Sequence, residues 1–111
     1  MRKAAQLFGL VSLAVVVAFV VYCWLLIHKY NSGLGAVAPG DSEARVTALL
    51  GSPSYSEPAG QPYLRYTGAP CSSPCVRRLW WEWPIFPGIE AWSVELNSNG
   101  QVIKTYHWVL P

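Results

Sequence analysis

The feature that most constrains this chain is an uncharged apolar run of twenty-one residues at positions 7–27. A helix rises about 1.5 Å per residue, so this run would extend about 31 Å, which matches the hydrocarbon core of a bilayer. Fourteen of its residues are Leu, Ile, Val or Phe, and none is Asp, Glu, Lys or Arg. The sequence therefore predicts a single transmembrane helix, so that residues 1–30 anchor the chain in membrane lipid.

The charges on either side of the run predict its orientation. Arg2, Lys3 and the terminal amine precede the run, whereas His28 and Lys29 follow it. The more positive flank of a transmembrane helix usually stays in the cytoplasm. We therefore expect a cytoplasmic N-terminus and a C-terminal domain on the other side of the membrane.

Two processed forms of the N-terminus stay open as alternatives to a retained anchor. A cleaved signal peptide has a shorter apolar region with a small-residue site close behind it. The triplet Ala36-Val37-Ala38 resembles such a site but lies far from the run. A bacterial lipoprotein would be cut just before a lipid-modified cysteine, and Cys23 is the candidate, although Tyr22 precedes it. The length of the run favours the retained anchor.

Charge and composition bound the remainder of the chain. Residues 31–40 are rich in Gly and Ala and carry no charge, which predicts a flexible tether over 31–41, followed by one small domain at 42–111. Beyond residue 28 there are six Lys or Arg and six Asp or Glu, so the net charge of +2 belongs to Arg2 and Lys3. A nucleic-acid-binding domain usually carries a basic excess. We therefore expect no nucleic-acid partner.

The domain begins with a predicted short helix. Asp41 or Ser42 can act as its N-cap, and Gly51 supplies a stop. Val46 and Leu50 fall on one face at helical spacing. A helix of about ten residues is too short to be stable alone, so it must pack on another element.

That element is predicted to be an antiparallel sheet of three to four strands, which makes the fold class α+β. Strands are expected at 62–67, 77–83, 91–97 and 101–109. In the second of these, alternation places Leu79, Trp81 and Trp83 on one face. The opposite face then carries Arg78, Trp80 and Glu82.

The last two strands are joined by an Asn99-Gly100 pair, which predicts a two-residue type I′ turn. Counting away from that turn, one residue at a time on each strand, gives the expected cross-strand pairs. The predicted pairs are Glu95 with Lys104, Leu96 with Ile103, and Trp92 with His107. The register therefore sets opposite charges on one face and large side chains on the other.

Several short segments carry a family resemblance. They are Gly40-Asp41-Ser42, Val46, Leu50-Gly51-Ser52-Pro53, Glu57-Pro58, Tyr63-Leu64-Arg65-Tyr66 and the closing segment 92–102. In this order, over about residues 37–106, the chain resembles the BamE-like (SmpA/OmlA) domain of bacterial envelope proteins. The resemblance implies a short helical layer on an antiparallel sheet and a non-catalytic role in outer-membrane assembly or a related envelope module.

The resemblance also implies a location and a class of partner. Together with the predicted anchor, it places the chain in the bacterial inner membrane with a periplasmic domain that binds another envelope protein. A processed N-terminus would instead make the chain an outer-membrane assembly lipoprotein.

Cys71 and Cys75 flank a Ser-Ser-Pro loop. Two neighbouring cysteines in a small domain of an oxidising compartment favour a disulfide, with two free thiols or a redox or metal role as alternatives. The spacing is not Cys-x-x-Cys, and His107 does not complete a zinc set. Ser42 and Ser93 have no evident catalytic partners. We therefore expect no metal, no cofactor and no catalytic residues.

The remaining candidates are aromatic and basic residues near the second predicted strand. One hypothesis joins Arg77, Arg78, Trp80, Ile85 and Phe86 into a patch that contacts a partner protein or the bilayer, because Trp and Arg are enriched at such contacts. The alternative is a Trp80 partly covered by long charged side chains. Two functions follow: a membrane-anchored protein-interaction module, or a lipid-contacting module that uses a Trp/Arg-rich loop.

Overall fold

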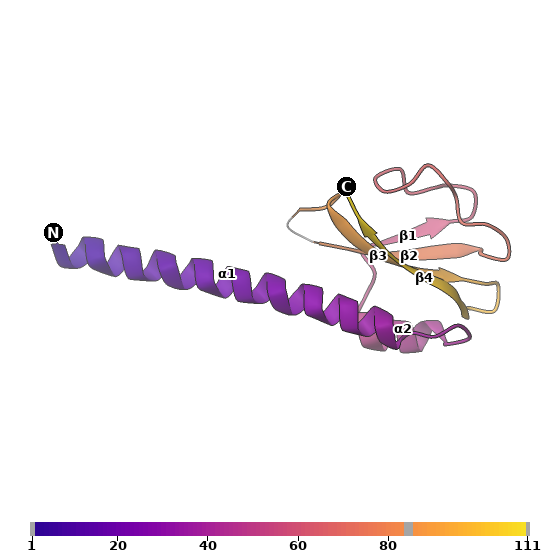
Figure 1. Ribbon diagram of the computed structural model, residues 1–111, viewed down its shortest axis with the longest axis horizontal. Coiled ribbons are helices and arrows are strands. Elements are labelled where there is room, and N and C mark those ends of the chain that lie inside the picture. The colour runs from indigo at the N-terminus through magenta and orange to yellow at the C-terminus, as the bar shows by residue number, and fades with distance from the viewer. Residues whose placement is uncertain (1, 84–85, 111) are drawn as a thin grey trace.

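The computed structural model describes residues 2–83 and 86–110 and consists of a long helix with a small α+β domain at its C-terminal end (Figure 1). The four strands form one antiparallel sheet in the order β1-β2-β3-β4. The predicted α+β class is therefore confirmed. The elements are α1 (Arg2–Ala36), α2 (Glu43–Leu50), β1 (Tyr55–Pro58), β2 (Arg77–Glu82), β3 (Glu90–Leu96) and β4 (Val102–Val109).

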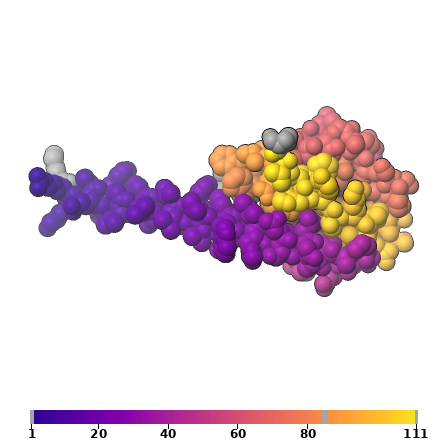
Figure 2. Space-filling view, viewed as in Figure 1, coloured from indigo at the N-terminus to yellow at the C-terminus, as the bar shows by residue number. Residues whose placement is uncertain are grey.

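Helix α1 is long and apolar enough to cross a membrane. Its N-terminal part projects away from the domain with its side chains uncovered (Figure 2). The helix also continues through residues 31–36, which corrects the predicted flexible tether. Packing explains the difference: Gly33 lies against α2 so closely that an added Cβ would sit 2.9 Å from Leu50 Cδ2 and 3.0 Å from the Leu49 carbonyl oxygen. This contact offsets the roughly 1 kcal/mol that glycine costs inside a helix.

Helix α2 forms as predicted, and its N-cap is Ser42 rather than Asp41. Ser42 Oγ accepts from the Arg45 amide at 3.2 Å, whereas the Asp41 carboxylate accepts from the Ala38 amide at 2.9 Å. Val46 and Leu50 are buried on the face that meets the sheet. The pattern that predicted this helix was therefore the pattern of its buried face.

Three of the predicted strands are present, but the one at 62–67 is wrong. That segment forms turns, with the Tyr66 amide bonded to the Tyr63 carbonyl at 3.0 Å. The first strand is instead β1, which pairs Glu57 with Arg78. The aromatic residues at 63 and 66 do not line a strand, because their rings cover Trp80 from a loop.

The β3–β4 hairpin reaches the predicted register by a different route. Among the described residues only glycines have positive φ, including Gly100 at 72°, so Asn99 is not in a type I′ turn. Asn97 instead pairs with Gln101 around a longer turn, and Leu96 lies opposite Val102 rather than Ile103. A β-bulge then inserts one residue. This restores the two predicted pairs beyond it, Glu95 with Lys104 and Trp92 with His107.

The core lies between the sheet and the two helices. It contains apolar side chains from α2, β2, β3 and β4, with residues of α1 packed against them. Its buried members are Val37, Val46, Leu50, Leu79, Trp81, Trp92, Val94, Leu96 and Val102. The opposite face of the sheet is covered by the loop at 59–76, so β2 is buried on both sides.

Candidate functional site

One face of α1 attaches the helix to the domain. Cys23, Ile27, Tyr30 and Leu34 are spaced four, three and four residues apart, which places them on one side of a helix. Ile27, Tyr30 and Leu34 pack against the core, and Cys23 is buried. The domain contact therefore begins inside the apolar run.

A polar bond locks this attachment in position. Trp92 Nε1 on β3 donates to Asn31 Oδ1 on α1 at 2.8 Å. The Tyr30 ring lies 4.9 Å from the Trp92 ring, centroid to centroid. The hydrogen bond and the ring contact together hold the end of α1 against β3.

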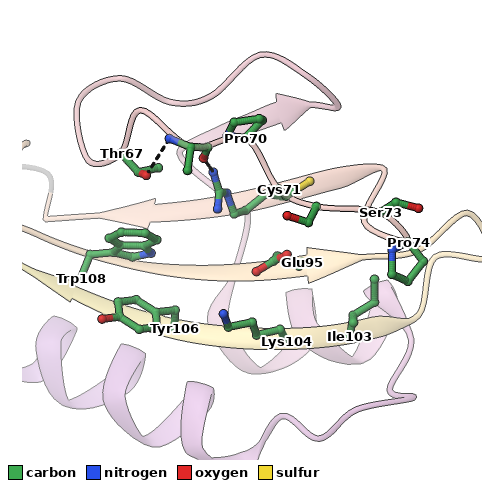
Figure 3. A pocket seen from close by; sticks show the side chains of 13 residues that line it. Thr67, Pro70, Cys71, Ser73, Pro74, Glu95, Ile103, Lys104, Tyr106 and Trp108 are labelled. Carbon is green, nitrogen blue, oxygen red and sulfur yellow. Dashed lines mark hydrogen bonds between the residues drawn. The ribbon is translucent and has the colours of Figure 1, made fainter.

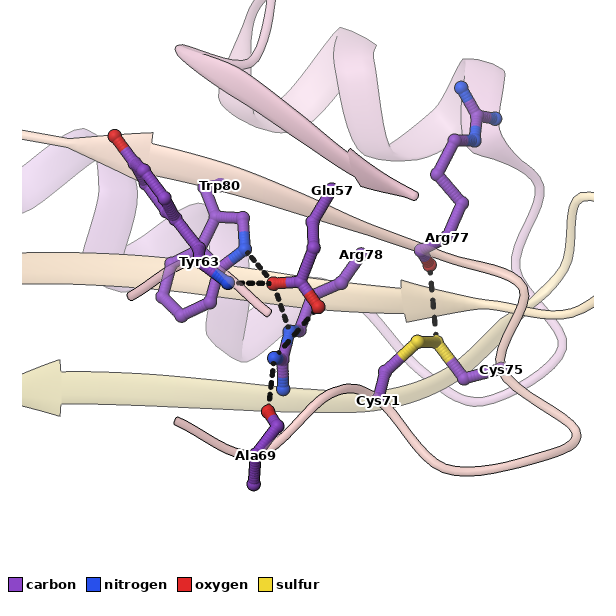
Figure 4. The surroundings of a disulfide bond; sticks show 8 residues. All are labelled: Glu57, Tyr63, Ala69, Cys71, Cys75, Arg77, Arg78 and Trp80. Carbon is purple, nitrogen blue, oxygen red and sulfur yellow. Dashed lines mark hydrogen bonds and ion pairs between the residues drawn. A yellow bond between two sulfur atoms is a disulfide. The ribbon is translucent and has the colours of Figure 1, made fainter. Parts of the chain in front are cut away.

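A buried ion pair lies on the opposite face of the sheet (Figure 4). Glu57 is fully buried, and its Oε1 and Oε2 accept from Arg78 Nε at 3.0 Å and Nη2 at 2.9 Å. Glu57 Oε1 also accepts from Trp80 Nε1 at 2.9 Å and from the Tyr63 amide at 3.1 Å. Arg78 Nη2 donates onward to the Ala69 carbonyl at 3.0 Å. A carboxylate so fully occupied by donors holds the loop on the sheet.

A second carboxylate, Glu82, lies further along β2 and completes this polar layer. It accepts from the hydroxyls of Tyr63 and Tyr66 and from Arg65 Nη1, the last at 2.6 Å. Burial, together with the bond to Glu82, raises the pKa of Tyr63 to about 12 and that of Tyr66 to about 12. Both phenols are therefore protonated donors at neutral pH, and they clamp the loop over Trp80.

These contacts decide where the predicted partner-binding residues lie. Trp80 faces the side that alternation predicted, but it is 0% exposed, and Arg78 is 5% exposed. Arg77 pairs with Glu43 of α2. Phe86 is half exposed, and Ile85 lies outside the described residues. The predicted patch is therefore not one continuous surface, because the loop covers its centre.

The structure joins Cys71 to Cys75 in a disulfide that closes the loop over β2 and β3. The two sulfurs and a Glu95 carboxylate oxygen lie within 4.8 Å of one another, a spacing that suits metal ligands. Both sulfurs are bonded to each other, however, so they supply no thiolate. In this state the cluster braces the loop and does not offer a metal-binding set.

A groove of about 530 Å³ separates the loop from β4 (Figure 3). Residues 67–74 form one wall, and side chains of β3 and β4 form the other. The groove combines the charges of Glu95 and Lys104 with the rings of Tyr106 and Trp108. Trp108 is fixed there, because its Nε1 donates to Ser93 Oγ at 2.8 Å. The groove runs beside β4, the outer strand of the sheet.

Sequence reasoning missed this groove, because its walls are more than twenty residues apart in the chain and one of them is irregular. It also missed the pairing of Glu57 with Arg78. The available signal was the acidic residue Glu57, which is followed in the sequence by two tyrosines and by Arg65.

Comparisons of the chain with protein-family models, curated proteins and solved structures found no match.

Proposed function

We propose that this chain is a non-catalytic, single-pass protein of the bacterial inner membrane whose periplasmic domain binds an extended segment of another envelope protein. The observation that carries the proposal is the continuity of α1. The same helix presents an exposed apolar surface over residues 7–22 and enters the domain core from residue 27 onward. The domain is therefore held at a fixed place beside the membrane.

Two further observations support the periplasmic side and the envelope role. A disulfide between Cys71 and Cys75 is stable in an oxidising compartment and rare in the cytosol. The positive flank at Arg2 and Lys3 favours a cytoplasmic N-terminus. The proposal also keeps the BamE-like character that the short sequence segments predict, which would favour a protein partner.

The groove beside β4 is the surface that best fits such a partner. The first residue of β4, Val102, already pairs through its backbone with Gly40 and Asp41. Beyond it, an outer strand can offer backbone donors and acceptors to an added strand, and pockets beside it select alternate side chains. Tyr106 is half exposed on the groove side, and the Lys104 Nζ lies 6.0 Å from the centre of its ring. An extended segment with an aromatic or acidic side chain would suit this wall.

A site-specific photo-crosslink tests the proposal. A photoreactive phenylalanine analogue at Tyr106, in the full chain in its native membrane, should give a discrete protein adduct. The matched control is the same analogue at Tyr55 on β1, the opposite edge of the sheet, where Tyr55 is also partly exposed. The adduct should weaken when Lys104→Glu replaces the cation beside Tyr106 with an anion. Equal adducts from Tyr106 and Tyr55, or no adduct from Tyr106, would contradict the assignment.

A further inference from the structure

An apolar surface lies at the end of the sheet where β3 begins and where β4 ends. The Glu90–His107 pair and the Arg65 side chain beside Gly88 border it. We call residues 86–89 together with 109–110 the tip. The four large apolar side chains of the tip are about half exposed: Phe86 at 50%, Ile89 at 45%, Val109 at 61% and Leu110 at 54%. A surface of this kind on a small domain usually contacts something else.

The tip is an ordered feature of the sheet. The Leu110 amide donates to the Ile89 carbonyl at 3.0 Å, which continues the β3–β4 pairing by one step. The Ile89 amide donates to the Phe86 carbonyl at 3.4 Å. The Phe86 ring also packs on Trp83, with 5.1 Å between the ring centroids. The backbone that carries these apolar side chains is therefore part of the hydrogen-bonded sheet.

The tip points back along α1 toward the N-terminus. In Figure 1 the start of β3 and the end of β4 lie on the side of the domain that faces the free part of the helix, and in Figure 2 the orange residues before β3 lie next to that part of the helix. Trp92 contacts α1 at residues 30–31. Ile89 is three residues further along β3, about 10 Å, and the same distance along a helix is about seven residues. The tip is therefore level with about residue 24.

That level coincides with the expected boundary of the bilayer. Counted from the cationic pair Arg2 and Lys3, the next twenty residues extend about 30 Å as a helix and end at Cys23. The apolar run at 7–27 ends about one turn further on, so the expected boundary lies between residues 23 and 27. Tyr22 and Trp24 are exposed there, where aromatic side chains favour the headgroup zone. Cys23 is buried at the same level, as expected if the domain overhangs the helix there.

We propose that the tip inserts into the lipid leaflet on the domain's side, as a second membrane contact beside α1. The occupant is the lipid itself, because α1 carries the apolar tip to the headgroup level, where the bordering charged groups can meet lipid headgroups, and keeps it there. The inference rests on the membrane span of the proposed function and adds to it an orientation of the domain. With both α1 and the tip in lipid, the groove beside β4 is held at a set height above the bilayer.

The test places one environment-sensitive fluorophore at a time on the full chain. In a Cys23→Ala background with the Cys71–Cys75 disulfide kept oxidised, single cysteines are introduced by Phe86→Cys, Leu110→Cys, Asn99→Cys and Val16→Cys. Each variant is labelled with a nitrobenzoxadiazole maleimide and reconstituted in vesicles of phosphatidylethanolamine and phosphatidylglycerol. Quenching is measured with lipids that carry a nitroxide near the headgroup or near the end of the acyl chain.

The proposal expects the probes at 86 and 110 to emit at shorter wavelength than the probe at 99, and to lose most intensity to the shallow nitroxide. Asn99, in the β3–β4 turn at the other end of the sheet, is the matched exposed control. The two tip probes come from different strands, so a fault in folding of one variant leaves the other to report.

Two outcomes would overturn the inference, and they are distinguishable. Tip probes that emit and quench like the probe at 99, while the probe at 16 is quenched by the deep nitroxide, would remove the second contact and leave the anchor intact. A probe at 16 that no lipid nitroxide quenches would remove the membrane span, and with it both the proposed function and the inserted tip.

Discussion

The two faces of strand β2 are both buried, yet they are buried by different means. On the helix side Leu79 and Trp81 pack into an apolar core. On the loop side Arg78, Trp80 and Glu82 enter a layer of ion pairs and hydrogen bonds. A helix satisfies its own backbone, so it can cover a sheet with apolar side chains alone.

An irregular loop cannot cover a sheet in that way, because its amides and carbonyls need partners. The loop at 59–76 obtains them from buried charges: the Tyr63 amide donates to Glu57, and the Ala69 carbonyl accepts from Arg78. The difference between the two faces indicates that the polar residues of β2 serve the fold. They hold an irregular cover in place.

The largest expected effect comes from breaking the buried ion pair. Glu57→Ala leaves the Arg78 guanidinium and the Trp80 indole without their acceptor, so the free energy of unfolding should fall by about 3–5 kcal/mol. Urea unfolding of the full chain in detergent, followed by Trp fluorescence, measures this change. The matched control Glu43→Ala removes a half-exposed pair with Arg77 and should cost no more than about 1 kcal/mol. Equal losses would contradict the structural role of the loop-side charges.

A substitution on the apolar face of β2 should lower the free energy of unfolding nearly as much, but it should loosen a different part of the molecule. Leu79→Ala creates a cavity beside the helices and should cost about 2–5 kcal/mol. Leu64→Ala, at a side chain that is largely exposed, should change stability by no more than about 0.5 kcal/mol. Hydrogen exchange should rise in α2 for Leu79→Ala and in residues 59–76 for Glu57→Ala. Identical exchange patterns would mean that the two faces are not separable.

A smaller effect is expected from the disulfide, which belongs to the loop side alone. For so short a loop, the chain-entropy model assigns the Cys71–Cys75 bond about 2 kcal/mol. The double change Cys71→Ser with Cys75→Ser should lower the stability by that amount and raise exchange around the groove, while α2 stays protected. Cys23→Ala is the control that removes a thiol without touching this bond. Loss of protection in α2 would argue against independent faces.

The smallest expected effect is a fall in stability at high pH. The pKa of Tyr63 and that of Tyr66 are raised to about 12 from the ordinary 10.0, so the unfolded chain loses these protons first as the pH rises. The stabilisation is therefore complete below about pH 10 and lost between about pH 10 and 12. Urea unfolding across this range should show the decline, and a Tyr63→Phe, Tyr66→Phe variant should show a shallower one. A rise in stability with pH would contradict the clamp on Glu82.

The sequence predicted those parts of the molecule whose side chains repeat with a regular period. The apolar run of α1, the face of α2 and the alternation in β2 each specify an element through local contacts. The Trp92–His107 pair was predicted by counting from a two-residue turn, and it is present because the longer turn and the β-bulge together restore that count. The strand predicted at 62–67 failed, because the two tyrosines there, three residues apart, cover Trp80 and reach Glu82 from a loop.

The features that the sequence did not predict depend on contacts between residues that are far apart in the chain. Gly33 and Gly35 favour a flexible segment by composition, yet the fit of Gly33 against α2 keeps the segment helical. Trp80 has the alternation of a solvent-facing residue, and only the folded loop removes it from the surface. Neither the groove beside β4 nor the tip has a local signature, because each combines segments that the sequence separates.

The central claim is that the domain is rigidly fixed to the helix proposed to span the membrane, and an electron–electron distance measurement tests it most directly. Spin labels at Val20→Cys on exposed α1 and Asn99→Cys in the domain, in a Cys23→Ala background in lipid nanodiscs, should give one narrow distance distribution. Gly33→Leu, which forces a side chain into Leu50 and the Leu49 carbonyl, should broaden it. A broad distribution in the chain that keeps Gly33, as a flexible tether over residues 31–41 would give, would contradict the account.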